Sequence, residues 1–267
     1  MKQTLHFIGG GNMASAIIGG LERSDSAHDI VVVDPNAEVR SKHQARGHQT
    51  LSSLSQVRGA TVLILAFKPQ HFVDAAEEVA AALADNALVI SILVGTSAAK
   101  IEGKLPGARV VRAMPNTPMM VGQGMTGVAP GAAATPEDVA LAASLFEASG
   151  RVLRIREEQI DDIAAVSGSG PAYVFRFVEA LLHAATHQCG FSPDDARLLV
   201  SETVQGAVAY LAAQPGYPAA QLREQVTSKG GTTQAALGVF EEADLNGLVS
   251  RALAAAQSRA EELNNHG

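Results

Sequence analysis

The fold is decided near the start of the chain, by the stretch Leu5-His6-Phe7-Ile8-Gly9-Gly10-Gly11-Asn12-Met13-Ala14. Its apolar first half is typical of a short buried strand, and its glycines match G-x-G-x-x-A at the opening of a helix pattern. There, Gly9 permits a tight turn, Gly11 lets a ligand approach the backbone, and the small Ala14 lets helix and strand pack closely. Amides at a helix start bind negative charge. We therefore predict that Ile8 to Met13 bind the pyrophosphate of a dinucleotide.

A second strand pattern ends in an acid, Asp34, which lies 25 residues after Gly9. This spacing is near the one at which such folds place a carboxylate against the adenosine ribose hydroxyls. A 2′-phosphate there would meet like charge, so Asp34 favours NADH over NADPH. Arg40 and Lys42 follow within two helical turns and are able to pair with that phosphate, which leaves NADPH open as the alternative cofactor.

Up to about residue 155 the chain alternates short apolar runs with amphipathic stretches, the pattern of βαβ units and a mostly parallel sheet. The strands are nearly continuous in apolar residues, which indicates that helices cover both faces of the sheet. We expect strands at residues 5–8, 30–33, 61–67, 88–92 and 110–114.

A helix is expected between Thr135 and Ser149, with Thr135 as its cap and Pro136 in its first turn. Beyond about residue 156 the strand signals stop, and the apolar residues take the helical period. We therefore predict an α/β protein: an N-terminal Rossmann-type domain with a mostly parallel sheet over residues 1–155, followed by an all-helical domain over residues 156–267.

The composition narrows the class of function. A formal net charge of −7 leaves no basic stripe for a nucleic-acid partner. No apolar run approaches the roughly 20 residues of a membrane span. The single cysteine, Cys189, cannot form an internal disulfide; it is expected to be a small buried residue in a cytoplasmic protein. No metal-binding motif is present, and the eight histidines are scattered, so we expect them at the surface or as caps.

Several polar segments at the ends of regular elements remain to be explained. Ala66-Phe67-Lys68-Pro69 follows a strand at the sheet edge where ligands bind, and Lys68 is interpreted either as a contact for ligand charge or as a solvated lysine. Gly168-Ser169-Gly170-Pro171 is expected to be an exposed-amide turn that leads into a long helix. Gly230-Gly231-Thr232-Thr233 is expected at another helix start, where amides bind small carboxylates well.

Taken together, these segments resemble the pyrroline-5-carboxylate reductases, and the resemblance spans nearly the whole chain. The matching motifs are the fingerprint at residues 9–14, A-x-K-P at 66–69, M-P-N-T-P at 114–118, S-G-S-G-P-A-Y at 167–173 and G-G-T-T at 230–233. The glycine fingerprint alone would indicate only a dinucleotide. The last two motifs, in this order, point to one family.

The resemblance implies reduction of 1-pyrroline-5-carboxylate to L-proline by NADPH or NADH, the last step of proline biosynthesis. It implies that Thr233 is the catalytic residue that hydrogen-bonds the ring nitrogen of the imine. The amides around Gly230, Gly231 and Thr232 would hold the substrate carboxylate, and the nicotinamide would lie near Asn116 and Thr117. It also implies a homodimer formed through the helical domain, or a decamer built from such dimers.

The chain departs from the family pattern at some positions. The family commonly carries Ser, Asn or Arg just after the second strand to accept the cofactor 2′-phosphate, whereas this chain has Asp34-Pro35-Asn36. Lys229 replaces a frequent proline before the glycine pair.

Two other functions fit part of the pattern. A small Rossmann reductase of the β-hydroxyacid dehydrogenase type has the same plan but needs a lysine soon after its glycine-rich helix start, and no lysine follows Gly170 within the next six residues. A non-catalytic dinucleotide sensor would bind cofactor without turnover, and would have little use for Gly230, Gly231 and Thr233.

Overall fold

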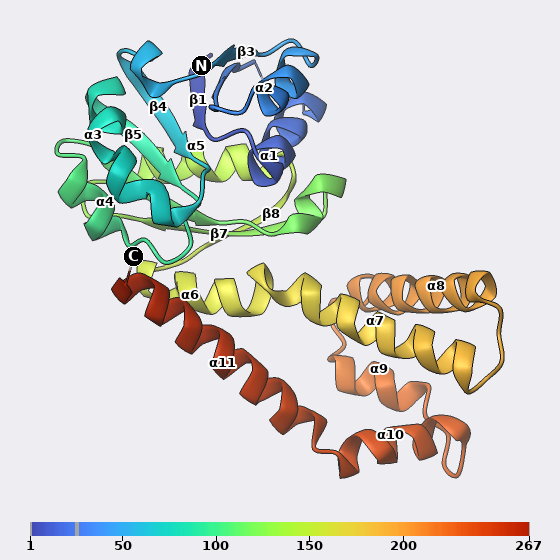
Figure 1. Ribbon diagram of the computed structural model, residues 1–267. Coiled ribbons are helices and arrows are strands. Elements are labelled where there is room, and N and C mark those ends of the chain that lie inside the picture. The colour runs from blue at the N-terminus through green and yellow to red at the C-terminus, as the bar shows by residue number, and fades with distance from the viewer. Residues whose placement is uncertain (1, 25–26, 267) are drawn as a thin grey trace. The chain divides into compact units, whose positions relative to one another are not determined.

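The computed structural model describes residues 2–24 and 27–266. Within them lies an eight-stranded sheet of order β3-β2-β1-β4-β5-β6-β7-β8 (Figure 1). All neighbouring strands run parallel except β6 and β7, which are antiparallel. The strands are β1 (Thr4–Ile8), β2 (Asp29–Val33), β3 (Gln49–Leu51), β4 (Ala60–Leu65), β5 (Leu83–Ser91), β6 (Arg109–Met114), β7 (Gly124–Pro130) and β8 (Gly150–Arg154).

Helices cover both faces of this sheet, as the apolar strands predicted (Figure 1). Side chains alternate between the faces of a strand: Leu5 and Phe7 of β1 pack with α1 (Asn12–Arg23) and α5 (Pro136–Glu147). Ile8, the next residue of β1, belongs to the core on the opposite face, which holds α3 (Phe72–Ala82) and α4 (Ala98–Lys104). The expected Thr135 cap is confirmed, because its hydroxyl accepts from the Asp138 amide at 3.2 Å. Helix α2 (Ala37–Gln44) and short helices at Leu54–Gln56, Pro69–His71 and Thr117–Val121 complete this part.

The five expected strands are confirmed as β1, β2, β4, β5 and β6, but three more strands escape the sequence pattern. β3 is only three residues long, and β8 is rich in arginine. β7 carries two glycines and ends in Pro130. The pairing of β7 with β8 needs a glycine at the start of β8, because a Cβ on Gly150 would collide with the backbone of Gly124. These strands therefore lack the apolar signal by which strands are recognised.

After Arg154 the described residues form helices. These are a 3₁₀-helix (Glu157–Gln159), α6 (Ile160–Ile163), a π-helix (Ala164–Gly168), α7 (Gly170–His187), α8 (Pro193–Ala212), α9 (Ala219–Gln225), α10 (Thr232–Glu242) and α11 (Leu245–His266). The helical period expected beyond about residue 156 is confirmed by these helices. Among residues 2–24 and 27–266, no helix is both long and apolar enough to cross a membrane.

The described chain divides into two compact units, residues 2–171 with 254–266 and residues 172–253. The domain boundary between residues 155 and 156, where strands give way to helices, remains a prediction. Two local expectations were wrong. No exposed-amide turn forms at Gly168–Pro171, because Gly168 ends a π-helix and α7 already begins at Gly170. Cys189 is exposed, because α7 ends at His187 and the chain turns there toward Gly190, whose φ is +77°.

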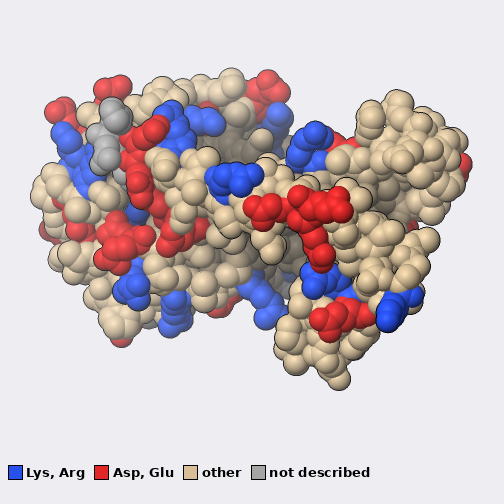
Figure 2. Space-filling view, turned by 90° about the horizontal axis from the view of Figure 1, so that it is seen from below, with Lys and Arg blue, Asp and Glu red and all other residues tan. Residues whose placement is uncertain are grey.

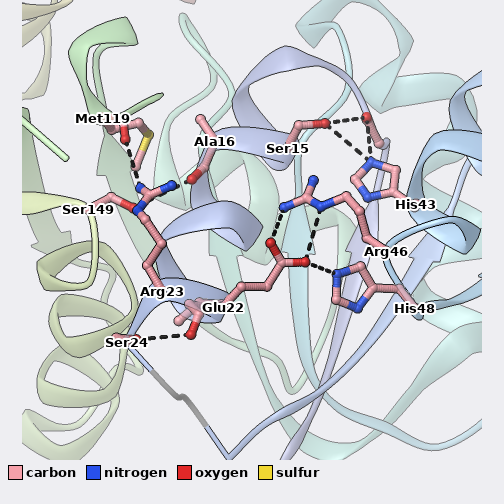
Figure 3. A network of polar contacts seen from close by, with 12 residues as sticks. Ser15, Ala16, Glu22, Arg23, Ser24, His43, Arg46, His48, Met119 and Ser149 are labelled. Atoms are coloured by element: carbon pink, nitrogen blue, oxygen red, sulfur yellow. Dashed lines mark hydrogen bonds and ion pairs between the residues drawn. The ribbon is translucent and has the colours of Figure 1, made fainter. Parts of the chain in front are cut away.

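Helix α1 is fixed against its surroundings at two places (Figure 3). Its Glu22 carboxylate accepts from Arg46 at 2.6 Å and contacts His48 at 2.7 Å. Burial raises the pKa of the Glu22 carboxyl, but hydrogen bonds from Arg46 and His48 outweigh burial, so the net pKa shift is downward. On its inner side α1 lies against the buried Ser149, whose hydroxyl reaches the Ala16 carbonyl at 3.5 Å.

The close approach of Ser149 makes two adjacent glycines of α1 unequal. A Cβ on Gly20 would stand 2.8 Å from the Ser149 Cβ and 3.1 Å from the Ala148 carbonyl oxygen. A Cβ on Gly19 would meet only the flexible ends of two arginines, at 3.3 and 3.4 Å. Gly20 is therefore required by packing, and Gly19 is not.

We expect Gly20→Ala to lower the free energy of unfolding by about 1–2 kcal/mol, because overpacking costs about 1–3 kcal/mol and helix propensity returns up to about 1. Gly19→Ala is the matched control and should stabilise the protein by up to about 1 kcal/mol. Urea unfolding followed by circular dichroism measures both. Equal stability of the two variants would contradict this packing of α1.

Candidate functional site

The carboxyl ends of the central strands meet at one edge of the sheet. The Gly9 amide donates to the Val33 carbonyl at 2.8 Å, and the Ala66 amide donates to the Ile8 carbonyl at 2.8 Å. The strand order reverses between β1 and β4, and in open α/β sheets ligands bind in the crevice outside such a point. A cleft of about 1400 Å³ lies there.

The cleft brings together nearly all of the residues predicted to bind a cofactor. Among the described residues, only Gly10 and Asn116 of the predicted set do not line the cleft. The predicted residues that line it are Ile8, Gly9, Gly11, Asn12, Met13, Asp34, Ala66, Phe67, Lys68, Pro69 and Thr117. Ser52 and Ser53 also line the cleft, and the sequence analysis missed them because β3, which they follow, carries no recognisable strand signal.

The glycine-rich turn has the geometry that its sequence predicts. Gly9 has a φ of +96°, and a Cβ on it would stand 2.6 Å from the Ala66 carbonyl oxygen, so a side chain is excluded there. A Cβ on Gly11 would instead stand in open space, more than 4 Å from any described atom it could meet. Ala14 is fully buried between helix and sheet. The cleft is thus open at Gly11, where a ligand would approach the backbone.

The start of α1 provides the positive end of this site. Gly11 is the N-cap of α1, and within the described chain no side chain caps the helix and no acid stands in its first turn. First-turn amides that are not capped remain available to an anion, and the helix dipole adds to the attraction. The residues present therefore fit a dinucleotide whose pyrophosphate lies over Gly11, Asn12 and Met13.

Asp34 lies at the end of β2 and lines the same cleft. One of its carboxylate oxygens accepts from the Gly10 amide at 2.9 Å, and the other accepts from the Asn36 amide at 2.8 Å. Each carboxylate oxygen can accept more than one hydrogen bond. Asp34 therefore holds the glycine turn while it faces the cleft, and its contact with a ribose stays a prediction.

Asn116 plays a different part from Thr117. Thr117 lines the cleft, whereas the buried Asn116 side chain is used within the protein. Its amide group donates to the Ser167 carbonyl and approaches the Ser167 hydroxyl, both at 3.1 Å, and its oxygen accepts from the Met125 amide at 2.9 Å. Asn116 thus ties the loop after β6, which forms one wall of the cleft, to β7 and to the π-helix. Its direct contact with a cofactor stays a prediction.

Outside the cleft, β6 carries an ion pair between a buried arginine and a half-buried glutamate. Arg112 of β6 is 4% exposed and lies 3.5 Å from the Glu157 carboxylate. Burial lowers the pKa of the Arg112 guanidinium, and the charges of Glu157 and Asp161 oppose that shift. Glu157 also accepts from the Ala98 amide at the start of α4. This pair fastens the first residues of the helical region to the sheet and does not line the cleft.

Two residues near the cleft differ from what the sequence suggested. Lys68 is exposed at the cleft, at the end of β4, so both interpretations of it remain open. His43 contradicts the expectation that the histidines lie at the surface or act as caps, because its side chain is 1% exposed. A signal was present: Val39 and His43 are four residues apart, which places both on one face of α2.

The glycine–threonine segment lies in the second compact unit. Gly231 is the N-cap of α10, and Gly230 has a φ of +76°, which confirms the expected helix start. The Gly230 amide donates to the Gln234 side chain, and the Gly231 amide donates to the Ser228 carbonyl at 3.0 Å. The amides of the first turn, at Thr232 and Thr233, are therefore the ones placed to receive a carboxylate.

The chain is similar to known proteins along its whole length. Residues 157–263 match the model of pyrroline-5-carboxylate reductase dimerisation, and residues 4–95 match that of NADP oxidoreductase, coenzyme F420-dependent. It is 39% identical to the pyrroline-5-carboxylate reductase of Pasteurella multocida, with 98% of each chain covered.

Two solved structures are similar over the whole chain. That of a pyrroline-5-carboxylate reductase from Coxiella burnetii has a TM-score of 0.89 at 40% identity and covers 98% of both chains. That of Plasmodium falciparum pyrroline carboxylate reductase with NADP bound has a TM-score of 0.85 at 26% identity, over 98% of this chain and 99% of that one.

Proposed function

The chain belongs to the pyrroline-5-carboxylate reductase family, and from that premise we propose which of its own residues carry the reaction. The protein is an NAD(P)H-dependent oxidoreductase that reduces 1-pyrroline-5-carboxylate to L-proline, the last step of proline biosynthesis. The observation that carries the assignment of its residues is the cleft at the sheet edge, open at Gly11 and facing the uncapped start of α1.

The cofactor is assigned to this cleft from end to end. Asp34 and the serines after β3 would hold the adenosine end, and the first turn of α1 would hold the pyrophosphate. Phe67 and Pro69 would pack beside it, and Thr117 would orient the nicotinamide amide group. When bound, the reduced nicotinamide supplies a hydride to the imine carbon.

The substrate is assigned to the start of α10. The Thr233 hydroxyl would hydrogen-bond the ring nitrogen, and the amides of Thr232 and Thr233 would bind the carboxylate. Gly230 and Gly231 would shape the turn, because their own amides are bound to Gln234 and Ser228. A protonated imine already accepts hydride well, so the protein has mainly to orient it, complement its charge and exclude water.

We expect Thr233→Ala to lower the turnover of 1-pyrroline-5-carboxylate by roughly 10- to 100-fold while dinucleotide affinity stays unchanged, because one hydrogen bond to a charged group is lost. The assay follows oxidation of the reduced nicotinamide on addition of the imine acid. Thr203→Ala, on an exposed face of α8, is the control and should keep wild-type turnover.

Several results would argue against this assignment. Wild-type turnover in Thr233→Ala would exclude the hydroxyl from the reaction. Oxidation of a β-hydroxyacid by the wild type in place of imine reduction would indicate the other reductase class. Dinucleotide binding without any turnover would indicate a sensor.

We further propose that the protein prefers NADH to NADPH. The Asp34 carboxylate faces the cleft, and the two basic residues near it in the sequence, Arg40 and Lys42, do not line the cleft. Arg40 donates to the carbonyls of Asp34 and Pro35, both at 2.8 Å, and Lys42 pairs with Glu38 at 3.1 Å. A 2′-phosphate in the cleft would therefore meet the carboxylate, whereas Arg40 and Lys42 lie outside the lining of the cleft.

We expect Asp34→Asn to shift the ratio of kcat/KM for NADH over NADPH toward NADPH by on the order of tenfold, since it removes the charge repulsion. Asn keeps an oxygen for the Gly10 amide, whereas Asp34→Ser shortens the side chain and should also raise KM for both cofactors. Asp29→Asn, at the opposite end of β2, is the control. A ratio unmoved by either change at Asp34, or a wild type that prefers NADPH, would contradict the proposal.

Membership of the family, with its dimerisation region over residues 157–263, supports oligomerisation. We propose a homodimer formed through the helices of the second unit; assembly of dimers into a decamer rests on the family resemblance alone. The large apolar side chains exposed on these helices include Val174, Phe175, Phe177, Leu198, Leu199, Val208, Tyr210, Leu211, Val239, Phe240, Leu245, Leu248 and Val249. In Figure 2 the part holding these helices shows broad surfaces without charged residues.

Light scattering at micromolar concentration should give at least a dimer, because an exposed apolar area of this extent marks an interface. Val208→Glu, at a position 62% exposed on α8, should weaken the assembly. Val73→Glu, at a position 46% exposed on α3 in the first unit, should leave it intact. A stable wild-type monomer would refute the proposal.

A cytoplasmic location without a nucleic-acid partner is proposed on composition alone. The chain has one cysteine and a formal net charge of −7. On the face shown in Figure 2, basic and acidic residues are interspersed, and the basic ones among the described residues form no continuous stripe there.

A further inference from the structure

His43 stands out because it is buried beneath the glycine turn and takes no part in the assignments above. Of the histidines in the described residues it alone is fully buried, at 1% exposed. Its Nε2 lies 2.9 Å from the Gly10 carbonyl oxygen and 3.3 Å from the Ser15 hydroxyl. Figure 3 shows the His43 ring turned toward Ser15. A carbonyl oxygen can only accept, so Nε2 must carry a hydrogen and donate it.

We propose that His43 is a positioning residue of the cofactor site, which fixes the Gly10–Gly11 peptide so that the Gly11 amide faces the dinucleotide. This inference rests on the dinucleotide-binding part of the function proposed above. It assigns a role to a side chain that touches neither cofactor nor substrate.

Hydrogen bonds hold Gly10 on both sides. Its amide donates to the Asp34 carboxylate at 2.9 Å, and its carbonyl accepts from His43. The Ser15 hydroxyl, in the first turn of α1, lies 3.3 Å from the same carbonyl oxygen and adds a second donor. Side chains from the residue after β2, from α2 and from α1 therefore converge on one residue of the turn.

The hydrogen bonds on the Gly10 carbonyl also orient the Gly11 amide, because both belong to one planar peptide group. Every peptide bond of the described chain is trans, so the Gly10 carbonyl and the Gly11 amide point in opposite directions. The carbonyl points to the buried imidazole, and the Gly11 amide is thereby turned away from it. Gly11 lines the cleft with open space around it. The amide is thus presented as an anion donor.

Steric contacts alone do not set the orientation of the Gly10–Gly11 peptide. A glycine on each side of the peptide lets it rotate at little cost, because φ/ψ regions closed to other residues are open to glycine. Gly10 has no room for a Cβ, which would stand 2.7 Å from Val39 and 2.8 Å from Val32. Since both positions lack side chains, hydrogen bonds must choose the orientation. The flipped peptide would direct a carbonyl oxygen at the phosphates.

The test compares His43→Leu, which fills the site but donates nothing, with His43→Gln, which keeps a side-chain N–H. His48→Gln is the matched control, because the His48 ring lies 6.3 Å from that of His43 and pairs with Glu22 at the surface. Calorimetry measures the affinity of each protein for NADH, ADP-ribose and adenosine. Steady-state kinetics at saturating cofactor measures kcat, and thermal melting reports stability.

We expect His43→Leu to weaken NADH and ADP-ribose by about tenfold, the effect of one lost hydrogen bond, and to leave adenosine and the saturated kcat within about twofold. His43→Gln should recover most of the affinity, and His48→Gln should match the wild type. A purely structural role would lower melting temperature without separating ADP-ribose from adenosine.

Unchanged ADP-ribose affinity in a folded His43→Leu would overturn the proposal, as would an equal loss for adenosine. If His43→Leu does not fold, Ser15→Ala, which removes the second donor to the same carbonyl, decides it: a loss confined to pyrophosphate ligands supports the role, and unaltered ADP-ribose binding refutes it. A wild type that binds ADP-ribose but does not reduce the imine would instead refute the proposed function alone.

Discussion

The turn at Gly9 is the constraint on which the rest of the structure depends. A Cβ on Gly9 would stand 2.6 Å from the Ala66 carbonyl oxygen and 3.0 Å from the Phe67 nitrogen, so β1 and β4 can end side by side only if residue 9 is glycine. That side-by-side ending sits where the order of strands reverses, and it opens the crevice. The positive φ of Gly9 then directs the chain into α1, whose uncapped start faces the crevice.

The need to hold this turn explains why several polar side chains lie at the edge of an apolar sheet. A glycine-rich turn is loose, and a binding site needs it in one conformation. The first unit meets this need from three elements, with Asp34 on the Gly10 amide and His43 and Ser15 on its carbonyl. Asn116 does the same for the far wall, where it joins the loop after β6 to Ser167 and Met125. Of these four supports only Asp34 lines the cleft; His43, Ser15 and Asn116 lie outside its lining and hold in place the residues that we propose bind the cofactor.

The sequence predicted the features that follow from local rules, and missed those that depend on tertiary partners. Apolar runs and the G-x-G-x-x-A spacing predicted β1, β2, α1 and the lining of the cleft, because each is encoded within a few neighbouring residues. The π-helix and β8 carry no such local signal. The part played by His43 is decided by Gly10, 33 residues away, and that of Asn116 by Ser167, 51 residues away. The sequence also did not predict that the Gly230 amide donates to the Gln234 side chain and so is not available to a substrate.

Our central claim is that this cleft binds the reduced nicotinamide whose hydride reduces the imine. The path of that hydride tests the claim most directly. The measurement is mass spectrometry of proline formed by the wild type from 1-pyrroline-5-carboxylate and reduced cofactor carrying deuterium at both positions of the nicotinamide C4. We predict one deuterium in each product molecule, at the former imine carbon, because the hydride passes directly from the nicotinamide C4 to that carbon. Product without the label, or label lost to solvent, would contradict it.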